Sequence, residues 1–417
     1  MLYNKYRAIL RANPLFASAI NLMASAGVSA LFGFIFWIVV ARSFNSESVG
    51  LATTLLSVSA LISLLGMAGF DTVFVRFLPK SEHRNETING GLIISAIATT
   101  VISLGFCLIA PLITPKIGFL SANVWNILAF VIFTIFGTWN VLTNAVLVAY
   151  RRTSFVIVIN IIFSAVKMVL PFVIKDGGAL VIFAFMGIAQ VVNVALSVAA
   201  LMKYYDYRPS LRINYEPIKK LRKYGSVVYF AHMTNLLPDS ILPLIVVDKL
   251  GAPSAAYFYI AFTIANLLYT IAFATTQALL AEASHEEDRI REHFGKAIKL
   301  TSALLVPISV VIIVVCPLVL SFFGDGYKGG ATSLLRILSL SGLAVMAYSG
   351  LGTLFKLTHD FRALMVTNAT NAISIIGLAF VFVGPWGLNG IGWAWLIGNV
   401  VSVASGGYYS LRWLRQR

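Results

Sequence analysis

The sequence contains little charge and very little cysteine. Only 11% of its 417 residues are charged, whereas a soluble domain typically has about 25%. Its two cysteines, Cys107 and Cys316, lie in apolar stretches and indicate neither a disulfide framework nor a zinc cluster. The sequence also lacks paired carboxylates, a nucleophile triad and a phosphate-binding glycine loop. We therefore expect no enzyme activity, no cofactor and no metal.

Long apolar runs dominate the sequence instead. Hydrophobic residues make up 59% of the chain and the mean hydropathy is +0.87, so the bilayer is its solvent. Runs of about 20 apolar residues predict helical spans, and they are too long for the strands of a membrane barrel. The first run also exceeds the core of a signal peptide. The predicted spans are 15–41, 50–70, 90–114, 124–149, 155–174, 179–202, 225–247, 255–281, 298–323, 333–355, 364–383 and 388–411.

The basic residues predict the orientation of these spans. The chain has 31 Lys and Arg residues against 16 Asp and Glu, which gives a net charge of +15. We count 24 of the 31 basic residues on the side of the two termini. One more, Lys167, is inside a span, and the opposite loops hold six. This asymmetry predicts cytoplasmic termini in the cell membrane, with membrane lipids and not nucleic acid as the partners of the basic excess. The six opposite residues are Arg42, Lys116, Lys175, Lys249, Lys328 and Arg336.

The chain shows signs of an internal duplication. Residues 203–224 form the longest hydrophilic stretch and predict a basic cytoplasmic linker. A shift of about 207 residues aligns the turn after residue 42 with the turn after residue 249. Six spans on each side of the linker predict a parallel repeat with a substrate path between the halves. The predicted domains are a bundle of residues 1–202, the linker, and a bundle of residues 225–417.

Polar residues inside two spans recur at helical spacing and form two predicted cavity faces. Neutral polar residues in spans most often form hydrogen bonds between helices. An ionised Lys or Asp at this depth costs roughly 2.5–3.5 kcal/mol, which favours a functional cavity. A Lys167–Asp239 ion pair is the main alternative for these two residues. The candidate cavity residues are Asn160, Ser164 and Lys167 in the fifth span, and His232, Asn235 and Asp239 in the seventh.

Several motifs follow one another in the order found in a known family. Residues 38–51, at the end of the first span, read IVVARSFNSESVGL, residues 69–79 read GFDTVFVRFLP, and residues 387–394 read GLNGIGWA. A further match starts at the FGDGY of residues 323–327. Together they resemble the polysaccharide and oligosaccharide flippases of the multidrug/oligosaccharidyl-lipid/polysaccharide exporter superfamily. Asn45 and Ser46 replace the Gly-Pro that is usual in that family's first motif.

The resemblance implies an all-α integral membrane fold of twelve helices, arranged as two six-helix bundles around a central cavity. It implies a glycan on a polyprenyl phosphate or diphosphate carrier as cargo, moved from the cytoplasmic to the outer leaflet by alternating access. Lys167 would be a counter-charge for that phosphate. Arg76 and Asp71 resemble family positions near the cytoplasmic entrance, where Arg76 would meet the headgroup. A salt bridge that fixes the helix end is the equal alternative for this pair.

Other functions are compatible with parts of this pattern. A cation-coupled multidrug exporter of the same superfamily would need acidic cavity residues, and only Asp239 and Asp71 are available. A polymerase or ligase of lipid-linked sugars would need a large external domain, and the predicted outer loops are short. A peptidoglycan-precursor flippase usually has two further spans. We expect a monomer, and the sequence leaves open whether a proton or sodium ion is coupled to transport.

Overall fold

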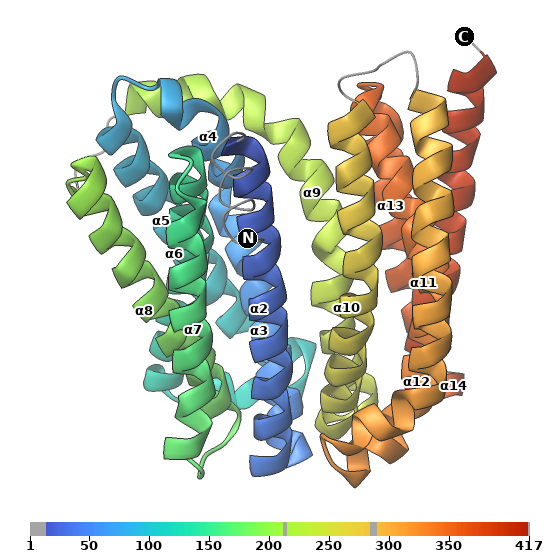
Figure 1. Cartoon of the computed structure of the whole chain (residues 1–417). Helices are drawn as coiled ribbons and strands as arrows, with labels where there is room; N and C mark the ends of the chain where they lie inside the picture. The colour runs from blue at the N-terminus through green and yellow to red at the C-terminus, as the bar shows by residue number, and fades with distance from the viewer. Residues whose placement is uncertain (1–13, 212–214, 284–289, 416–417) are drawn as a thin grey trace, which may run out of the picture. The chain divides into compact units, whose positions relative to one another are not determined.

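The computed structural model describes residues 14–211, 215–283 and 290–415, and these residues form helices joined by short turns (Figure 1). No strand occurs in these three ranges. The elements are α2 (Pro14–Ser43), α3 (Ser46–Met67), α4 (Phe70–Phe77), η1 (Leu78–Lys80), α5 (Arg84–Ile113), η2 (Pro115–Leu120), α6 (Val124–Ala149), α7 (Thr153–Val173), α8 (Ala179–Tyr205), α9 (Tyr215–Leu250), α10 (Ala252–Ala283), α11 (Ile290–Ser321), α12 (Asp325–Leu340), α13 (Gly342–Leu357) and α14 (Phe361–Arg415).

All twelve predicted apolar ranges fall on these helices. Among the described residues, eight helices are long and apolar enough to cross a membrane, and the number is nine if the bent pair α12 and α13 forms one span. Two of the predicted ranges lie on α14, whose 50-residue apolar stretch is far longer than one crossing needs. Gly387, with φ of 54°, interrupts α14 between those two ranges. The fold is therefore an all-α integral membrane fold.

Contacts divide the chain into two compact units. The first comprises Met1–Phe44 and Ser59–Tyr229, and the second comprises Asn45–Val58 and Phe230–Arg417. This division differs from the predicted bundles, which place all of α3 in the first half. In the first unit α2 packs on α7, and α6 packs on α5 and α8; in the second, α10 and α14 pack on both α12 and α13.

Small and hydroxyl side chains hold the helices of the first unit together. The hydroxyls of Ser59 and Thr134 are 3.0 Å apart, which joins α3 to α6. Those of Thr99 and Thr138 are 3.1 Å apart and join α5 to α6. Gly66 lets α3 approach α5, because a Cβ added there would collide with Thr99. These contacts are the interhelical hydrogen bonds expected of neutral polar residues in spans.

The connection between α8 and α9 is shorter than the predicted linker of residues 203–224. Helix α8 continues to Tyr205 and α9 begins at Tyr215, so most of the hydrophilic stretch is helical. The start of the connection docks on α5: the Tyr207 hydroxyl donates to Asn89 Oδ1 at 2.5 Å, and Asn89 Nδ2 donates to the Arg208 carbonyl at 3.0 Å. Burial raises the pKa of Tyr207 to about 12. Its neutral hydroxyl therefore fixes the chain as it leaves α8.

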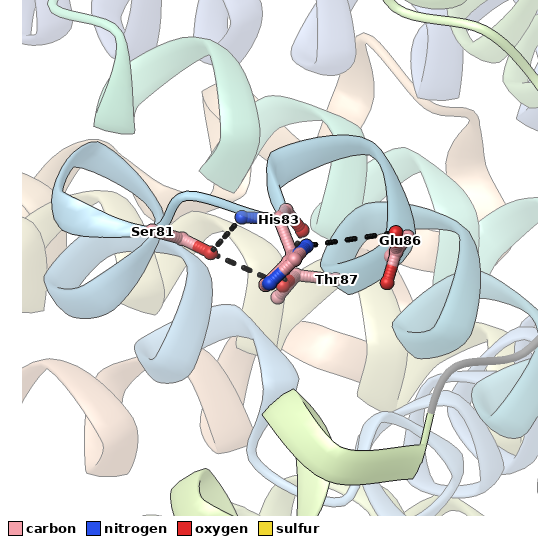
Figure 2. A network of polar contacts seen from close by, with 4 residues as sticks. All are labelled: Ser81, His83, Glu86 and Thr87. Atoms are coloured by element: carbon pink, nitrogen blue, oxygen red, sulfur yellow. Dashed lines mark hydrogen bonds and ion pairs between the residues drawn. The ribbon is translucent and has the colours of Figure 1, made fainter.

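A polar network orders the turn that leads into α5 (Figure 2). The His83 N–H donates to Ser81 Oγ at 3.2 Å, and Thr87 Oγ1 donates to the His83 carbonyl at 2.8 Å. His83 Nδ1 also lies 3.6 Å from Glu86 Oε1 in an exposed contact. No side chain of this network accepts a hydrogen bond from the first N–H groups of α5. The network therefore fixes the turn before the helix through local contacts.

Candidate functional site

Lys167 lies on α7 where that helix packs against α2. Its side chain is buried, with 6% of its surface exposed. The ammonium Nζ lies 5.0 Å from the centroid of the Phe163 ring and 5.7 Å from that of Phe36. Gly33 of α2 lies beside it, since a Cβ added there would be in ordinary van der Waals contact at 3.9 Å from Nζ. The ammonium thus lies between aromatic rings, at a depth predicted for the membrane interior.

Ser164 lies one turn before Lys167 on the same helix. Its side chain is fully buried, and its hydroxyl has no hydrogen-bond partner among the described residues. Aromatic faces attract a cation by about 0.5–2 kcal/mol each but accept no conventional hydrogen bond. A buried ammonium beside an unsatisfied hydroxyl therefore gives α7 a group of donors that an oxyanion would satisfy.

Asn160 has a different environment on the same face of α7. Its Oδ1 accepts a hydrogen bond from Asn193 Nδ2 of α8 at 3.2 Å, and Asn193 Oδ1 accepts one from Ser197 Oγ at 3.4 Å. Asn193 and Ser197 are fully buried. Because this chain of side chains joins α7 to α8, it accounts for Asn160 as an interhelical contact of the first unit.

In the second unit, Asn235 is part of a hydrogen-bonded chain that crosses three helices. Asn235 Nδ2 on α9 donates to the Tyr348 hydroxyl on α13 at 2.7 Å, and that hydroxyl donates to Asn368 Oδ1 on α14 at 2.9 Å. Asp239, one turn after Asn235, interacts electrostatically with Tyr348 and with Tyr269 of α10. The structure thus places Asn235 and Asp239 in one polar cluster of the second unit.

The remaining predicted residues do not all join these clusters. The side chain of His232 lies outside the described part of the chain. Lys167 belongs to the first unit and Asp239 to the second, so the alternative of an ion pair between them stays a prediction. Within the described residues, no group of three or more His, Cys, Asp or Glu side chains is placed to hold a metal ion.

Asp71 and Arg76 lie at opposite ends of the short helix α4. The motif predicted to close the second span instead forms this separate helix, because Ala68 and Gly69 turn the chain with positive φ. Asp71 is in the first turn and Arg76 in the last. Five residues on a helix correspond to a rotation of about 140°, which points the two side chains to different sides. Each charge instead suits the helix dipole at its own end.

Sequence reasoning did not identify Tyr348 or Asn368, although both belong to the Asp239 cluster. It also did not identify Asn371, whose Nδ2 donates to Asn399 Oδ1 at 3.2 Å inside α14. Asn368 and Asn371 are three residues apart in a predicted span, which is the same signal that identified the face on α7. Tyr348 carries no such signal, since a lone tyrosine in an apolar helix is common.

These features define a class of protein: a multi-pass membrane transporter fold with polar clusters inside each helical unit. An inward-facing structure of a multidrug resistance MATE family transporter of the MOP superfamily is similar, with a TM-score of 0.73, 17% identity and coverage of 96% of this chain and 98% of that one. An inward closed structure of the lipid II flippase MurJ gives a TM-score of 0.75 with 13% identity, covering 94% and 87%. An outward-facing structure of a MATE family transporter gives a TM-score of 0.65 with 19% identity, and the match covers 98% of this chain and 97% of that one.

The sequence also matches a family described as polysaccharide biosynthesis protein over residues 39–332. Because this match covers well over half of the chain, the protein belongs to that family. No curated protein matches the sequence. The chain is therefore a member of a polysaccharide biosynthesis family with the fold seen in MATE transporters and in MurJ.

Proposed function

We propose that the protein flips a lipid-linked oligosaccharide, carried on a polyprenyl phosphate or diphosphate, from the cytoplasmic to the outer leaflet. Membership of a polysaccharide biosynthesis family supports a glycan cargo. Similarity to the structure of the lipid II flippase MurJ supports a lipid carrier for that glycan. We further propose that the chain lies in the cell membrane as a monomer with both termini in the cytoplasm, as the distribution of basic residues predicts.

The observation that carries this proposal is the buried ammonium of Lys167. Its contacts are the rings of Phe36 and Phe163, and the partnerless hydroxyl of Ser164 lies on the same helix face. The attraction between two opposite charges is far stronger in a medium of low dielectric constant than in water. A phosphate oxygen supplies that charge and accepts hydrogen bonds from both groups. Lys167 and Ser164 would thus bind the carrier phosphate during its passage.

We propose that Arg76 meets the headgroup before this step. Its side chain is exposed at the end of α4, with its guanidinium 5.7 Å from the ring centroid of Phe77. An exposed arginine can contact a phosphate through two parallel hydrogen bonds. Asp71 would then help to orient α4 without touching the cargo.

A second candidate, cation-coupled multidrug export, is favoured by the cluster around Asp239. Asp239 interacts electrostatically with Tyr348 and Tyr269, and Asn235 donates to the Tyr348 hydroxyl. Such oxygen groups would suit a proton or a hard cation. The same cluster would serve a flippase as the site of an energy-coupling ion. The two functions therefore differ at Lys167, which a phosphate-bearing cargo needs and a cationic drug does not.

A flipping assay with reconstituted protein tests the proposal. The probe is a polyprenyl diphosphate carrying a fluorescent disaccharide, in phosphatidylcholine vesicles, and flipping is followed by quenching from outside. We expect Lys167→Met to lower the rate at least tenfold and Lys167→Arg to retain part of it. Replacing a buried charge by a residue of similar volume is often neutral for stability or better, so Lys167→Met should keep its melting temperature. Lys175→Met, in an exposed loop, is the control.

Flipping by Lys167→Met at the rate of the Lys175→Met control would refute the role of the ammonium. Export of ethidium from the same vesicles, lost in Asp239→Asn and kept in Lys167→Met, would favour the multidrug exporter instead.

A further inference from the structure

Arg336 is an exposed charged residue on α12 of the second unit. The sequence assigned it to a loop, but α12 begins at Asp325 and the bent pair α12 and α13 qualifies as one apolar span. Arg336 follows Asp325 by eleven residues, which is roughly 16 Å along a helix. Its side chain is exposed. A lipid-exposed guanidinium at this depth is costly unless something satisfies it.

A proline on the neighbouring helix explains how the base of this side chain is held. Pro317 of α11 has no N–H, so the carbonyl of Ile313, four residues earlier, loses its helical partner. Arg336 Nε donates to this carbonyl at 3.3 Å, and Cys316 Sγ donates to it at 3.2 Å. The guanidinium is therefore anchored through Nε at this carbonyl and interacts with the Cys316 thiol, while the side chain as a whole stays exposed.

The surface around this anchor is apolar and faces outward. Val310 and Val314 on α11, within a turn of Ile313, are 55% and 69% exposed, and Leu318 is 62% exposed. The helices that pack on α12 are α10, α11, α13 and α14, and they offer no carboxylate at this level. Neither Asp nor Glu occurs in residues 252–281, 293–321, 342–357 and 361–415. A counter-charge for Arg336 must therefore come from outside these helices.

A polar stripe leads from Arg336 to the start of α12. Lys328, Thr332 and Arg336 are spaced by four residues and share one face of the helix. Side chains on a helix lean toward its N-terminus, so Arg336 leans toward Lys328 and the end of the bundle. Gly329 leaves this end open, because a Cβ added there would meet nothing within 4 Å. Both Lys328 and Arg336 are exposed.

We propose that this stripe binds the phosphate of an anionic phospholipid from the leaflet at the start of α12. Arginine binds phosphate through two parallel hydrogen bonds, and lysine adds a second positive charge toward the headgroup. The exposed valines and leucine beside it contact the acyl chains of the same lipid. The site takes a lipid of the surrounding bilayer and is independent of the cargo bound at Lys167.

Native mass spectrometry of the full-length protein tests this site. Delipidated protein is titrated with phosphatidylglycerol or with phosphatidylcholine, and the fraction carrying one lipid is measured. We expect phosphatidylglycerol to bind at least fivefold more tightly than phosphatidylcholine. Arg336→Gln should weaken phosphatidylglycerol binding by a similar factor, and Lys328→Gln should weaken it by a smaller one. Lys116→Gln removes an exposed charge in the first unit and should change nothing.

A second pair of variants separates lipid binding from the capping of Ile313. Pro317→Ala restores the helical N–H for that carbonyl, so Arg336 is no longer needed as its partner. In this background, Arg336→Gln should still lose phosphatidylglycerol, and 10 mM inorganic phosphate should not compete with the lipid. Equal lipid binding with and without Arg336 in the Pro317→Ala background would overturn the proposal. Displacement of the lipid by inorganic phosphate would also overturn it, because the site would then select a free anion.

Discussion

Tyr348→Phe is the sharpest test of the Asn235–Tyr348–Asn368 chain, because it removes one oxygen and preserves the ring. The hydroxyl takes part in two interhelical hydrogen bonds, of 2.7 and 2.9 Å, and its residue is 6% exposed. Interhelical hydrogen bonds in membranes contribute about 0.6 kcal/mol on average and about 1.7 kcal/mol at most. Two of them lost together predict a destabilisation of about 1–3 kcal/mol.

Equilibrium unfolding in mixed micelles measures this difference, with Tyr408→Phe as the matched control. Tyr408 is 66% exposed, so loss of its hydroxyl should leave the free energy of unfolding unchanged. A double-mutant cycle of Tyr348→Phe with Asn368→Ala should give a coupling of at least about 0.5 kcal/mol, since contacting residues are not additive. Additive effects, or equal stability of Tyr348→Phe and Tyr408→Phe, would mean that the chain of hydrogen bonds does not contribute to stability.

Two further predictions concern the connection between α8 and α9 and the orientation of the chain in the membrane. Burial raises the pKa of Tyr207 from 10.0 to about 12, so its contribution to stability is complete below pH 10 and is lost as the pH rises toward 12. The difference in absorbance at 295 nm between wild type and Tyr207→Phe should titrate near pH 12, and a midpoint near 10 would contradict the buried contact. For the orientation, an impermeant maleimide should label Asp176→Cys in intact cells, and Leu211→Cys only after permeabilisation; the reverse pattern would invert the topology.

The apolar helices were predictable from the sequence because each apolar run exceeds the length of a membrane crossing. The limits of the linker were not. Residues 215–224 are hydrophilic, and we interpreted charge as a sign of a connecting loop. Lysine, leucine and arginine are nevertheless good helix formers, and a proline is tolerated in the first turn, where Pro217 lies. Polarity therefore predicted where the apolar span begins, at residue 225, whereas the helix α9 begins ten residues earlier, at Tyr215.

The candidate site was predictable only in part, for a related reason. Lys167 was identified because a charge inside a span is costly wherever its neighbours lie. Phe36 and Gly33, which surround its ammonium, come from α2, more than 120 residues earlier in the chain. Nothing in the spacing along α7 indicates that α2 packs there. Pairings of this kind depend on tertiary packing, so sequence patterns predict the charged residue and not its environment.

Lys167 and Arg336 differ in environment, and this difference is the basis for the different roles that we propose for the two cations. Lys167 is buried between aromatic rings, where only a molecule that enters the helical unit can supply an anion. Arg336 is exposed beside lipid-facing valines and is held by a carbonyl that Pro317 leaves free. A bilayer lipid reaches the second residue without any movement of the protein, whereas the first needs an opening of the structure. Either cation could bind a phosphate by its charge, and burial is what separates the proposed cargo site at Lys167 from the proposed lipid site at Arg336.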